Sequence, residues 1–132
     1  MLVSPQVDGV CIGTILVLEE EALVSVMIED FLLDQGALEV LVCSNPEAAE
    51  VAVARRNVDC AILGVTLGAS DSFGLADELD RRDVPFLFAT ATGPEAIVAR
   101  HRHRPILAKP YSNDQLLEFM HAAVLAQREE PA

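Results

Sequence analysis

Charged and hydroxyl side chains follow several apolar runs of this chain, and together they have the chemistry of a phosphoryl-binding site. Glu19 and Glu20 come directly after one run, and two adjacent carboxylates can hold a hard divalent cation such as Mg2+. Thr90 and Lys109 follow two later runs, and a hydroxyl and an ammonium can bind phosphoryl oxygens. The pattern also calls for a carboxylate nucleophile after the run at 60–63, but Gly64 stands there.

The apolar runs alternate with segments of helical periodicity. Short runs rich in branched residues predict buried strands, and apolar residues at helical spacing predict helices. Five alternations predict a single α/β domain with a flavodoxin-like (βα)5 fold, a doubly wound parallel sheet in the strand order 2-1-3-4-5. We expect strands at 13–18, 38–43, 59–64, 84–90 and 105–108, and helices at about 22–35, 45–56, 72–82, 93–101 and 113–127.

The carboxyl ends of the predicted strands bring the singled-out residues to one edge of the sheet. In such sheets function gathers beyond these ends, near the point where the strand order reverses. Glu19, Glu20 and Gly64 lie at that point, and Thr90 and Lys109 end the last two strands. Pro110 follows Lys109, and an X-Pro bond can be cis, which would aim the lysine back over the sheet.

Composition limits the range of functions. The 132 residues carry a net charge of −12, which opposes binding to nucleic acid or to an anionic membrane. Three cysteines without a CxxC pair indicate free thiols rather than a disulfide framework or a zinc site. No apolar stretch approaches the length of a membrane span, so we expect a cytoplasmic protein. The domain is expected at 13–127, between an N-terminal tail at 1–12 and a C-terminal tail at 128–132.

Four motifs in this order resemble the receiver domain of bacterial two-component response regulators, over roughly residues 14–127. Each motif stands at the end of a predicted strand, which makes the set much more specific than any one member. The matching residues are Ile15-Leu16-Val17-Leu18-Glu19-Glu20, Ala61-Ile62-Leu63-Gly64, Phe88-Ala89-Thr90 and Lys109-Pro110.

The resemblance implies a module that takes a phosphoryl group from a histidine kinase onto an aspartate with the help of Mg2+. It implies that Glu19 and Glu20 are the cation ligands, Thr90 the switch hydroxyl and Lys109 the phosphate contact. Phosphorylation in such domains remodels the face formed by the last two helices and the last strand.

Three departures from the family pattern change this expectation. Gly64 has no side chain to accept a phosphoryl group, and neither Asp59 nor Asp71 stands at a suitable position. The acidic pair is Glu-Glu, whereas the family usually has at least one Asp. Ile106 stands where many receivers have a rotating aromatic residue. We therefore expect a pseudo-receiver without a cofactor, or with weak Mg2+ binding at Glu19 and Glu20. Its lysine, Lys109, would then form a salt bridge with one of these glutamates.

The run at 100–104, Arg-His-Arg-His-Arg, is the main basic cluster of an acidic chain. One interpretation is a solvated loop, and the other is an interaction face made by Arg100, Arg102, Arg104 and Ile106. Without an acceptor, we expect the chain to be a stand-alone binding module, not an enzyme, that acts by protein–protein interaction. Its partner would be a histidine kinase, a phosphotransferase or an output protein, and homodimerisation is compatible with the sequence. The alternatives are a conventional phospho-switch with another acceptor and a sensor of a small anion at the vacated site.

Overall fold

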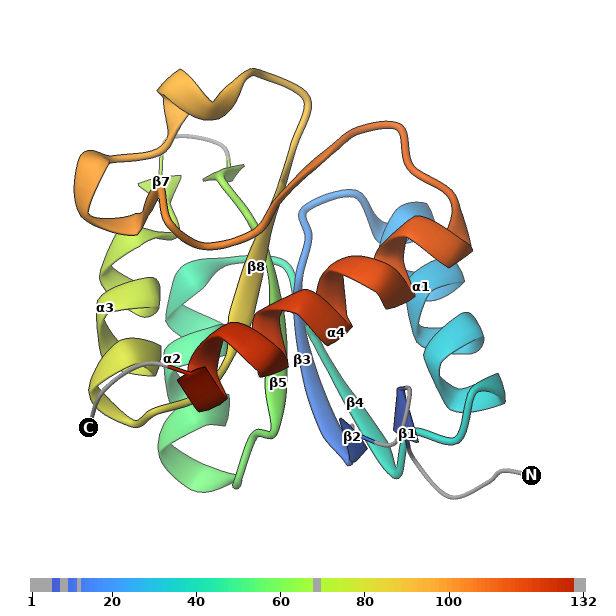
Figure 1. Ribbon diagram of the computed structural model, residues 1–132. Helices are drawn as coiled ribbons and strands as arrows, with labels where there is room; N and C mark the ends of the chain where they lie inside the picture. Colours follow the sequence, from blue (N-terminus) through green and yellow to red (C-terminus); the bar gives the residue numbers. More distant parts are fainter. Residues whose placement is uncertain (1–5, 8–9, 12, 68–69, 130–132) are drawn as a thin grey trace.

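The computed structural model describes residues 6–7, 10–11, 13–67 and 70–129. Its main feature is a parallel five-stranded sheet in the order β4-β3-β5-β8-β9 (Figure 1). The strands are β3 (Thr14–Leu18), β4 (Glu39–Cys43), β5 (Cys60–Gly64), β8 (Phe86–Thr90) and β9 (Ile106–Ala108). In order of appearance this is 2-1-3-4-5, which confirms the predicted flavodoxin-like topology.

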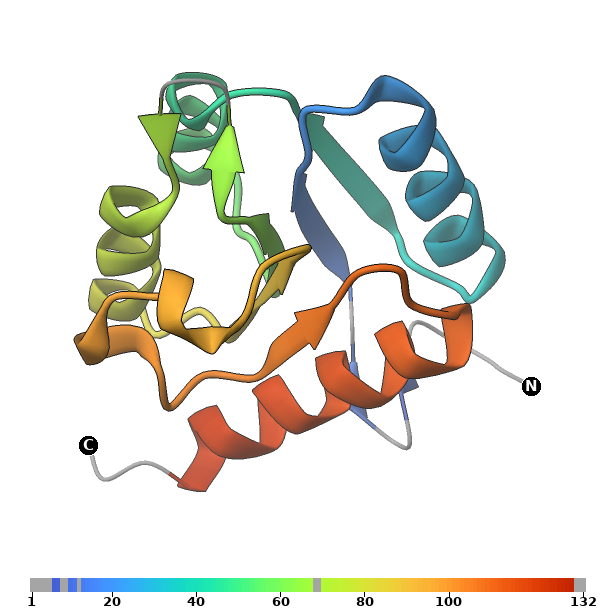
Figure 2. The same cartoon turned by 90° about the horizontal axis from the view of Figure 1, so that it is seen from above.

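Four α-helices cover the two faces of the sheet (Figure 2). The face with α1 (Ala22–Asp34) and α4 (Asn113–Glu129) receives Ile15 and Val17 of β3. The face with α2 (Pro46–Arg55) and α3 (Phe73–Arg81) receives Leu16 and Leu18. Because successive strand residues point to opposite faces, a strand buried on both sides is apolar throughout, as predicted for this sheet.

Local signals in the sequence agree with several helix ends. Asn45 caps α2, since its side-chain oxygen accepts the backbone N–H of Ala48 at 2.8 Å. Gly36 follows α1 with φ at +102°, a conformation that glycine adopts without a steric penalty. Cys43 and Cys60 are buried free thiols, as expected, and burial raises the pKa of Cys60 to about 12.

The predicted helix at 93–101 is wrong. Two short 3-10 turns, η1 (Pro94–Ala96) and η2 (Ala99–His101), stand there instead. Ile97 and Val98 between them have extended backbone, which suits β-branched residues better than helix does. The connection between β5 and α3 contains two further short strands, because β6 (Thr66–Leu67) pairs with β7 (Ser70–Asp71) in an antiparallel sheet.

Both predicted tails contain described structure. Residues 6–7 and 10–11 form an antiparallel pair, β1 (Gln6–Val7) with β2 (Val10–Cys11), and the rest of 1–12 lies outside the described residues. At the other end α4 continues to Glu129, two residues past the expected boundary at 127, and residues 130–132 are not described. None of the helices in the described ranges is long and apolar enough to cross a membrane.

Candidate functional site

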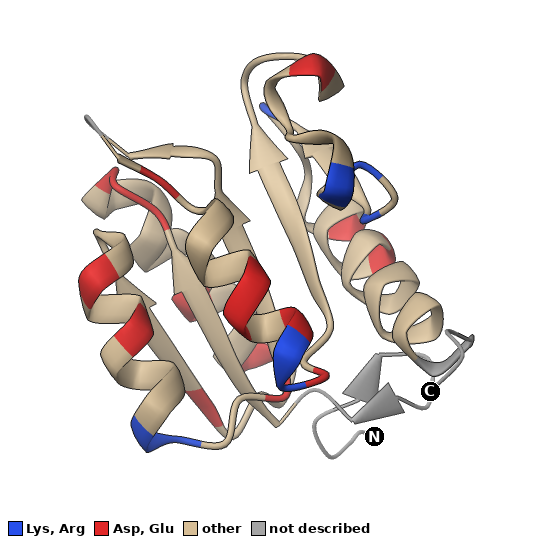
Figure 3. Cartoon of the chain, turned by 90° about the vertical axis from the view of Figure 1, so that its left-hand side faces the viewer, with Lys and Arg blue, Asp and Glu red and all other residues tan. Residues whose placement is uncertain are grey.

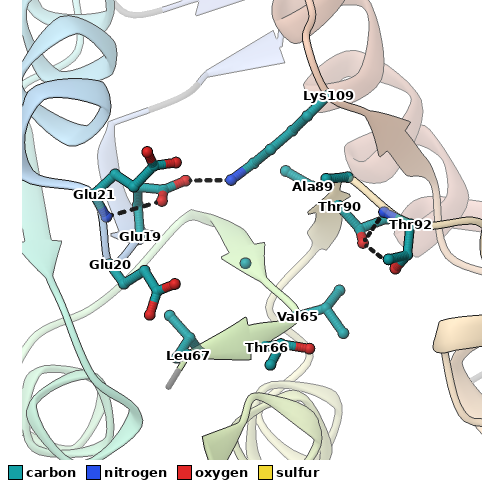
Figure 4. Close-up of a pocket in the computed structure, with 12 residues that line it drawn as sticks. Glu19, Glu20, Glu21, Val65, Thr66, Leu67, Ala89, Thr90, Thr92 and Lys109 are labelled. Carbon is teal, nitrogen blue, oxygen red and sulfur yellow. Dashed lines mark hydrogen bonds and ion pairs between the residues drawn. The ribbon is translucent and has the colours of Figure 1, made fainter. Parts of the chain in front are cut away.

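An open cavity of about 220 Å3 lies at the carboxyl ends of the central strands. Residues at the carboxyl ends of four strands meet there, as predicted from the strand order (Figure 4). The lining consists of residues 19–21 after β3, residues 64–67 from the last residue of β5 to β6, residues 89–92 from the end of β8, and Lys109 after β9. All the residues predicted for the phosphoryl site except Pro110 line this cavity.

Glu19 and Lys109 form an ion pair across the cavity. The Lys109 Nζ donates to Glu19 Oε1 at 2.8 Å, and the second oxygen of that carboxylate accepts the backbone N–H of Glu21 at 3.0 Å. Glu19 is only 5% exposed, so both of its oxygens are held in a mostly dry setting. Figure 4 shows the lysine extended over the cavity towards this carboxylate. The predicted lysine–glutamate salt bridge is present, and Glu19 is the partner.

The sheet positions both members of this pair. The backbone N–H of Glu19 donates to the Cys43 carbonyl at 3.0 Å, and that of Lys109 donates to the Thr90 carbonyl at 2.9 Å. Each residue therefore continues the strand ladder one position beyond its strand. The Lys109–Pro110 peptide bond is cis, as the sequence led us to expect.

Gly64, where the resemblance places the acceptor, is the last residue of β5 and pairs with Ala89 of β8. A Cβ added there would lie 3.1 Å from the Leu18 carbonyl oxygen and 3.7 Å from Leu67. The first distance is tight and the second is ordinary van der Waals contact, so the site has nearly enough room for a side chain. Packing therefore imposes only a weak requirement for glycine at this position.

Thr90 is buried at the end of β8 and belongs to a small hydroxyl cluster. Its Oγ1 accepts the backbone N–H of Thr92 at 3.1 Å and lies 2.9 Å from the Thr92 hydroxyl. Sequence reasoning missed Thr92, although a second hydroxyl two residues after a strand-end threonine is a recognisable turn signal. The bond holds the Thr90 hydroxyl towards its own turn.

Tyr111 is a second residue that sequence reasoning missed. It is half-buried beside the site, and its hydroxyl has no hydrogen-bond partner among the described residues. Burial and the nearby charge of Glu19 raise the pKa of Tyr111 to about 12. Its place directly after the Lys109–Pro110 bond was the available sign that it would lie close to the site.

The structure buries part of the predicted interaction face at 100–104 and leaves Arg100 and Arg102 exposed. Arg104 is buried, stacks over the Phe86 ring with its guanidinium carbon 4.6 Å from the centroid, and contacts Asp80. Arg100 forms two 2.8 Å hydrogen bonds with Asp77 of α3. The alternative of a solvated loop is also wrong for the buried positions, because His101 is only 1% exposed.

The two other residues of that predicted face are an exposed arginine and a half-buried isoleucine. Arg102 Nε donates to the Ile97 carbonyl at 2.7 Å, and Ile106 is half-buried against the apolar cluster under α2 and α3. Figure 3 shows acidic residues spread over the helices and basic residues in the segment that carries η2. Arg100 and Arg104 of this segment therefore pair with carboxylates of α3, whereas Arg102 is exposed and binds the backbone of its own segment.

A doubly wound sheet with an acidic loop, a threonine and a lysine–proline at its carboxyl end defines a CheY-like receiver fold. Comparison with solved structures supports this class. The chain is 36% identical to SdrG from Sphingomonas melonis, with a TM-score of 0.71 over 86% of this chain and 97% of that one. It is 32% identical to the BeF3-activated conformation of SdrG from Pseudomonas melonis, with a TM-score of 0.73 and the same shares covered.

A receiver domain from a third organism is similar in structure as well. The REC domain of the response regulator PhyR from Erythrobacter litoralis is 24% identical, with a TM-score of 0.73 over 91% of this chain and 95% of that one. No protein-family model and no curated protein matches the chain. From the similarity to SdrG over nearly its whole length, the chain belongs to the response regulator receiver (CheY-like) domains.

Proposed function

We propose that this domain works in two-component signalling by protein–protein interaction, without accepting a phosphoryl group. The single observation that carries the proposal is Gly64 at the acceptor position of an otherwise assembled site. Glycine offers no nucleophile. The two other candidates are not among the lining residues of the cavity: Asp59 accepts the backbone N–H of Thr14, and Asp71 that of Phe73.

The state of Lys109 supports the same proposal. The ammonium that would bind phosphoryl oxygens already neutralises Glu19 at 2.8 Å. Because Glu19 also accepts the Glu21 N–H, a phosphoryl group would have to replace an ion pair that is already well satisfied. The pair closes the site in one conformation, which suits a constitutive binding module.

Cation binding at this site should be weak at most. Mg2+ needs several oxygen ligands in near-octahedral geometry, and Glu19 and Glu20 supply only two carboxylates. One Glu19 oxygen is held by Lys109, and no set of three acidic, histidine or cysteine residues in the described ranges is arranged around a common metal position. We expect any Mg2+ to compete with Lys109 for Glu19.

The charge of the cavity argues against the small-anion alternative. Three glutamates, Glu19, Glu20 and Glu21, line it against the single ammonium of Lys109. A bound anion would face this excess of negative charge at short range. An interaction module is therefore the better interpretation of the vacated site.

The contact surface that the structure favours is on α1. Leu23 and Met27, one helical turn apart, are 73% and 63% exposed, and Val26 and Leu33 are exposed beside them. An apolar groove of about 510 Å3 lies between this helix and the segment around Tyr111. Large exposed apolar side chains gathered on one helix mark interaction sites.

The chemistry of the partner follows from the charges around this helix. Glu20, Glu21, Asp30 and Asp34 are exposed near or on α1, so the partner should combine an apolar centre with a basic rim. A second copy of the chain would bring the same acidic rim, which opposes a symmetric dimer through this face. A histidine kinase, a phosphotransferase or an output protein with a basic helical surface fits both requirements.

The test compares the wild type with Gly64→Asp under acetyl phosphate and under beryllofluoride with Mg2+. We expect the wild-type protein to show no phosphoryl adduct in intact mass and no shift of the Thr90 and Lys109 amide signals. An adduct in Gly64→Asp alone would locate the loss of chemistry at this residue. An adduct in the wild type would contradict the proposal and favour a conventional phospho-switch.

A further inference from the structure

The connection between β8 and β9 is held to the domain mainly by polar contacts. We call residues 94–104 the strap; it contains η1 and η2 and replaces the helix that the sequence predicted. Ile97 is its one fully buried apolar side chain within the described structure. Most of its other residues are exposed, so apolar burial alone does little to keep it in place.

Asp77 of α3 is the first anchor of the strap. Both of its oxygens accept from Arg100 at 2.8 Å, and one also lies 2.7 Å from His101 Nε2. Because a carboxylate accepts hydrogen bonds, the neutral imidazole must carry its proton on Nε2 here. The hydrogen bonds from Arg100, supported by the one from His101, lower the pKa of Asp77 to about 2. One carboxylate thus binds two consecutive strap residues.

Asp80, one turn further along α3, is the second anchor. It contacts the buried guanidinium of Arg104, which also donates to Gln127 of α4 at 3.0 Å. His101 Nδ1 lies 3.5 Å from Asp80 Oδ2 and makes no hydrogen bond in the described structure. That distance is too long for a good bond, so His101 is held from the Asp77 side alone.

The strap connects the two halves of the candidate site. It begins after Thr90 and Thr92 and leads into β9, which ends before Lys109. Under the strap, the His101 ring lies 5.8 Å from the Phe86 centroid and 6.0 Å from that of Phe88. Phe88 lies two residues before Thr90 on the same face of β8. A displacement of the strap would therefore move the turn that holds the Thr90 hydroxyl.

We propose that Asp77 and Asp80 form a polar latch that keeps the strap closed over β8, and that opening this latch is a conformational switch of the domain independent of phosphorylation. The latch is nearly balanced in charge, with two carboxylates facing two guanidiniums and one imidazole. An acidic group that competes for Arg100 would open it, since Arg100 is exposed and Asp77 is half-exposed.

The test is amide hydrogen exchange on the full chain with Asp77→Asn. The amides of His101, Arg102 and Arg104 are bonded within the strap, so their exchange reports strap opening. We expect exchange at these amides to accelerate by about threefold to fivefold in Asp77→Asn, because hydrogen bonds to a half-exposed charged group are lost. Arg100→Gln, which leaves the His101 contact, should accelerate them less.

Glu78→Gln is the matched control. Glu78 lies between the two anchors on α3, but its contacts are to Arg81 and Arg82 of the same helix end. This variant should leave strap exchange at the wild-type rate. Strap exchange that is unchanged in Asp77→Asn, or accelerated equally throughout the domain, would overturn the latch. Faster strap exchange with unshifted Thr92 and Lys109 amide signals would overturn its coupling to the site.

Discussion

Removing the ammonium of Lys109 should destabilise the domain, because it would leave Glu19 charged and nearly buried without its cation. Breaking a fully buried ion pair by removing one partner costs about 3–5 kcal/mol. The Lys109 side chain is 25% exposed, and Glu19 keeps the N–H of Glu21. We therefore expect Lys109→Met to lower the free energy of unfolding by about 2 kcal/mol.

Glu19→Gln should rescue much of this loss. As a single change it should cost about 1 kcal/mol, since the amide oxygen still accepts the Glu21 N–H while Lys109 can turn to solvent. In the double variant no charge is left buried, and we expect a loss of about 1.5 kcal/mol rather than the sum of the single losses. The coupling energy is then about 1.5 kcal/mol.

Urea unfolding followed by circular dichroism measures the free energy of unfolding of the wild type, the two single variants and the double variant. Equal slopes of this free energy against urea concentration would show that the unfolded states are comparable. Lys109 is the only lysine in the chain, so selective 15N-lysine labelling reports the site with a single amide signal. Glu20→Gln, which removes an exposed neighbouring carboxylate, is the control and should be nearly neutral. If the two single losses added up to the loss in the double variant within about 0.5 kcal/mol, the ion pair would contribute nothing to the stability of the fold.

Three further predictions concern titration and packing. Tyr111 is the only tyrosine and the chain has no tryptophan, so an ultraviolet titration should show one phenol ionising near pH 12, and Glu19→Gln should lower that midpoint. The lowered pKa of Asp77 stabilises the fold above its unfolded pKa near 4, and this stabilisation should be lost as pH falls from about 4 to about 2. This stabilisation should amount to less than about 1 kcal/mol because the side chain is half-exposed. It should be absent in Asp77→Asn, so the free energy of unfolding of that variant should depend less on pH between about 2 and 4 than that of the wild type. The same pH dependence in both proteins would contradict the prediction. Gly64→Ala should change the free energy of unfolding by less than about 1 kcal/mol, since a Cβ there has one tight contact, at 3.1 Å; a larger loss would mean that glycine is required for packing.

The strand order and the site at its edge could be predicted because both follow from short-range patterns. Apolar runs buried on both faces specify strands of a covered parallel sheet, and the carboxyl ends of such strands meet at one edge. Thr90 is the last residue of its strand, and Glu19 and Lys109 each directly follow the last residue of theirs. Small errors in strand boundaries therefore did not separate them.

The strap could not be predicted in the same way. The sequence at 93–101 begins with Gly93-Pro94, and a proline at the first helical position favours a helix. What opposes the helix is tertiary: Arg100, His101 and Arg104 bind carboxylates of α3 that lie more than 20 residues away. No local pattern indicates which of the 21 acidic residues a basic run will meet.

On the proposal that Gly64 stands in place of an acceptor carboxylate, the Glu19–Lys109 pair is a consequence of that replacement. In a site with a carboxylate at position 64, that group and Glu19 would share the single ammonium of the cavity. With glycine there, the lysine has only glutamates within the lining, and it binds the buried one. Gly64→Asp should therefore weaken the Glu19–Lys109 bond even before any phosphodonor is added. The Lys109 amide signal should shift in that variant, and the coupling energy between Glu19 and Lys109 should fall. A coupling energy equal to that measured with Gly64 would show that the residue at position 64 has no influence on the pair.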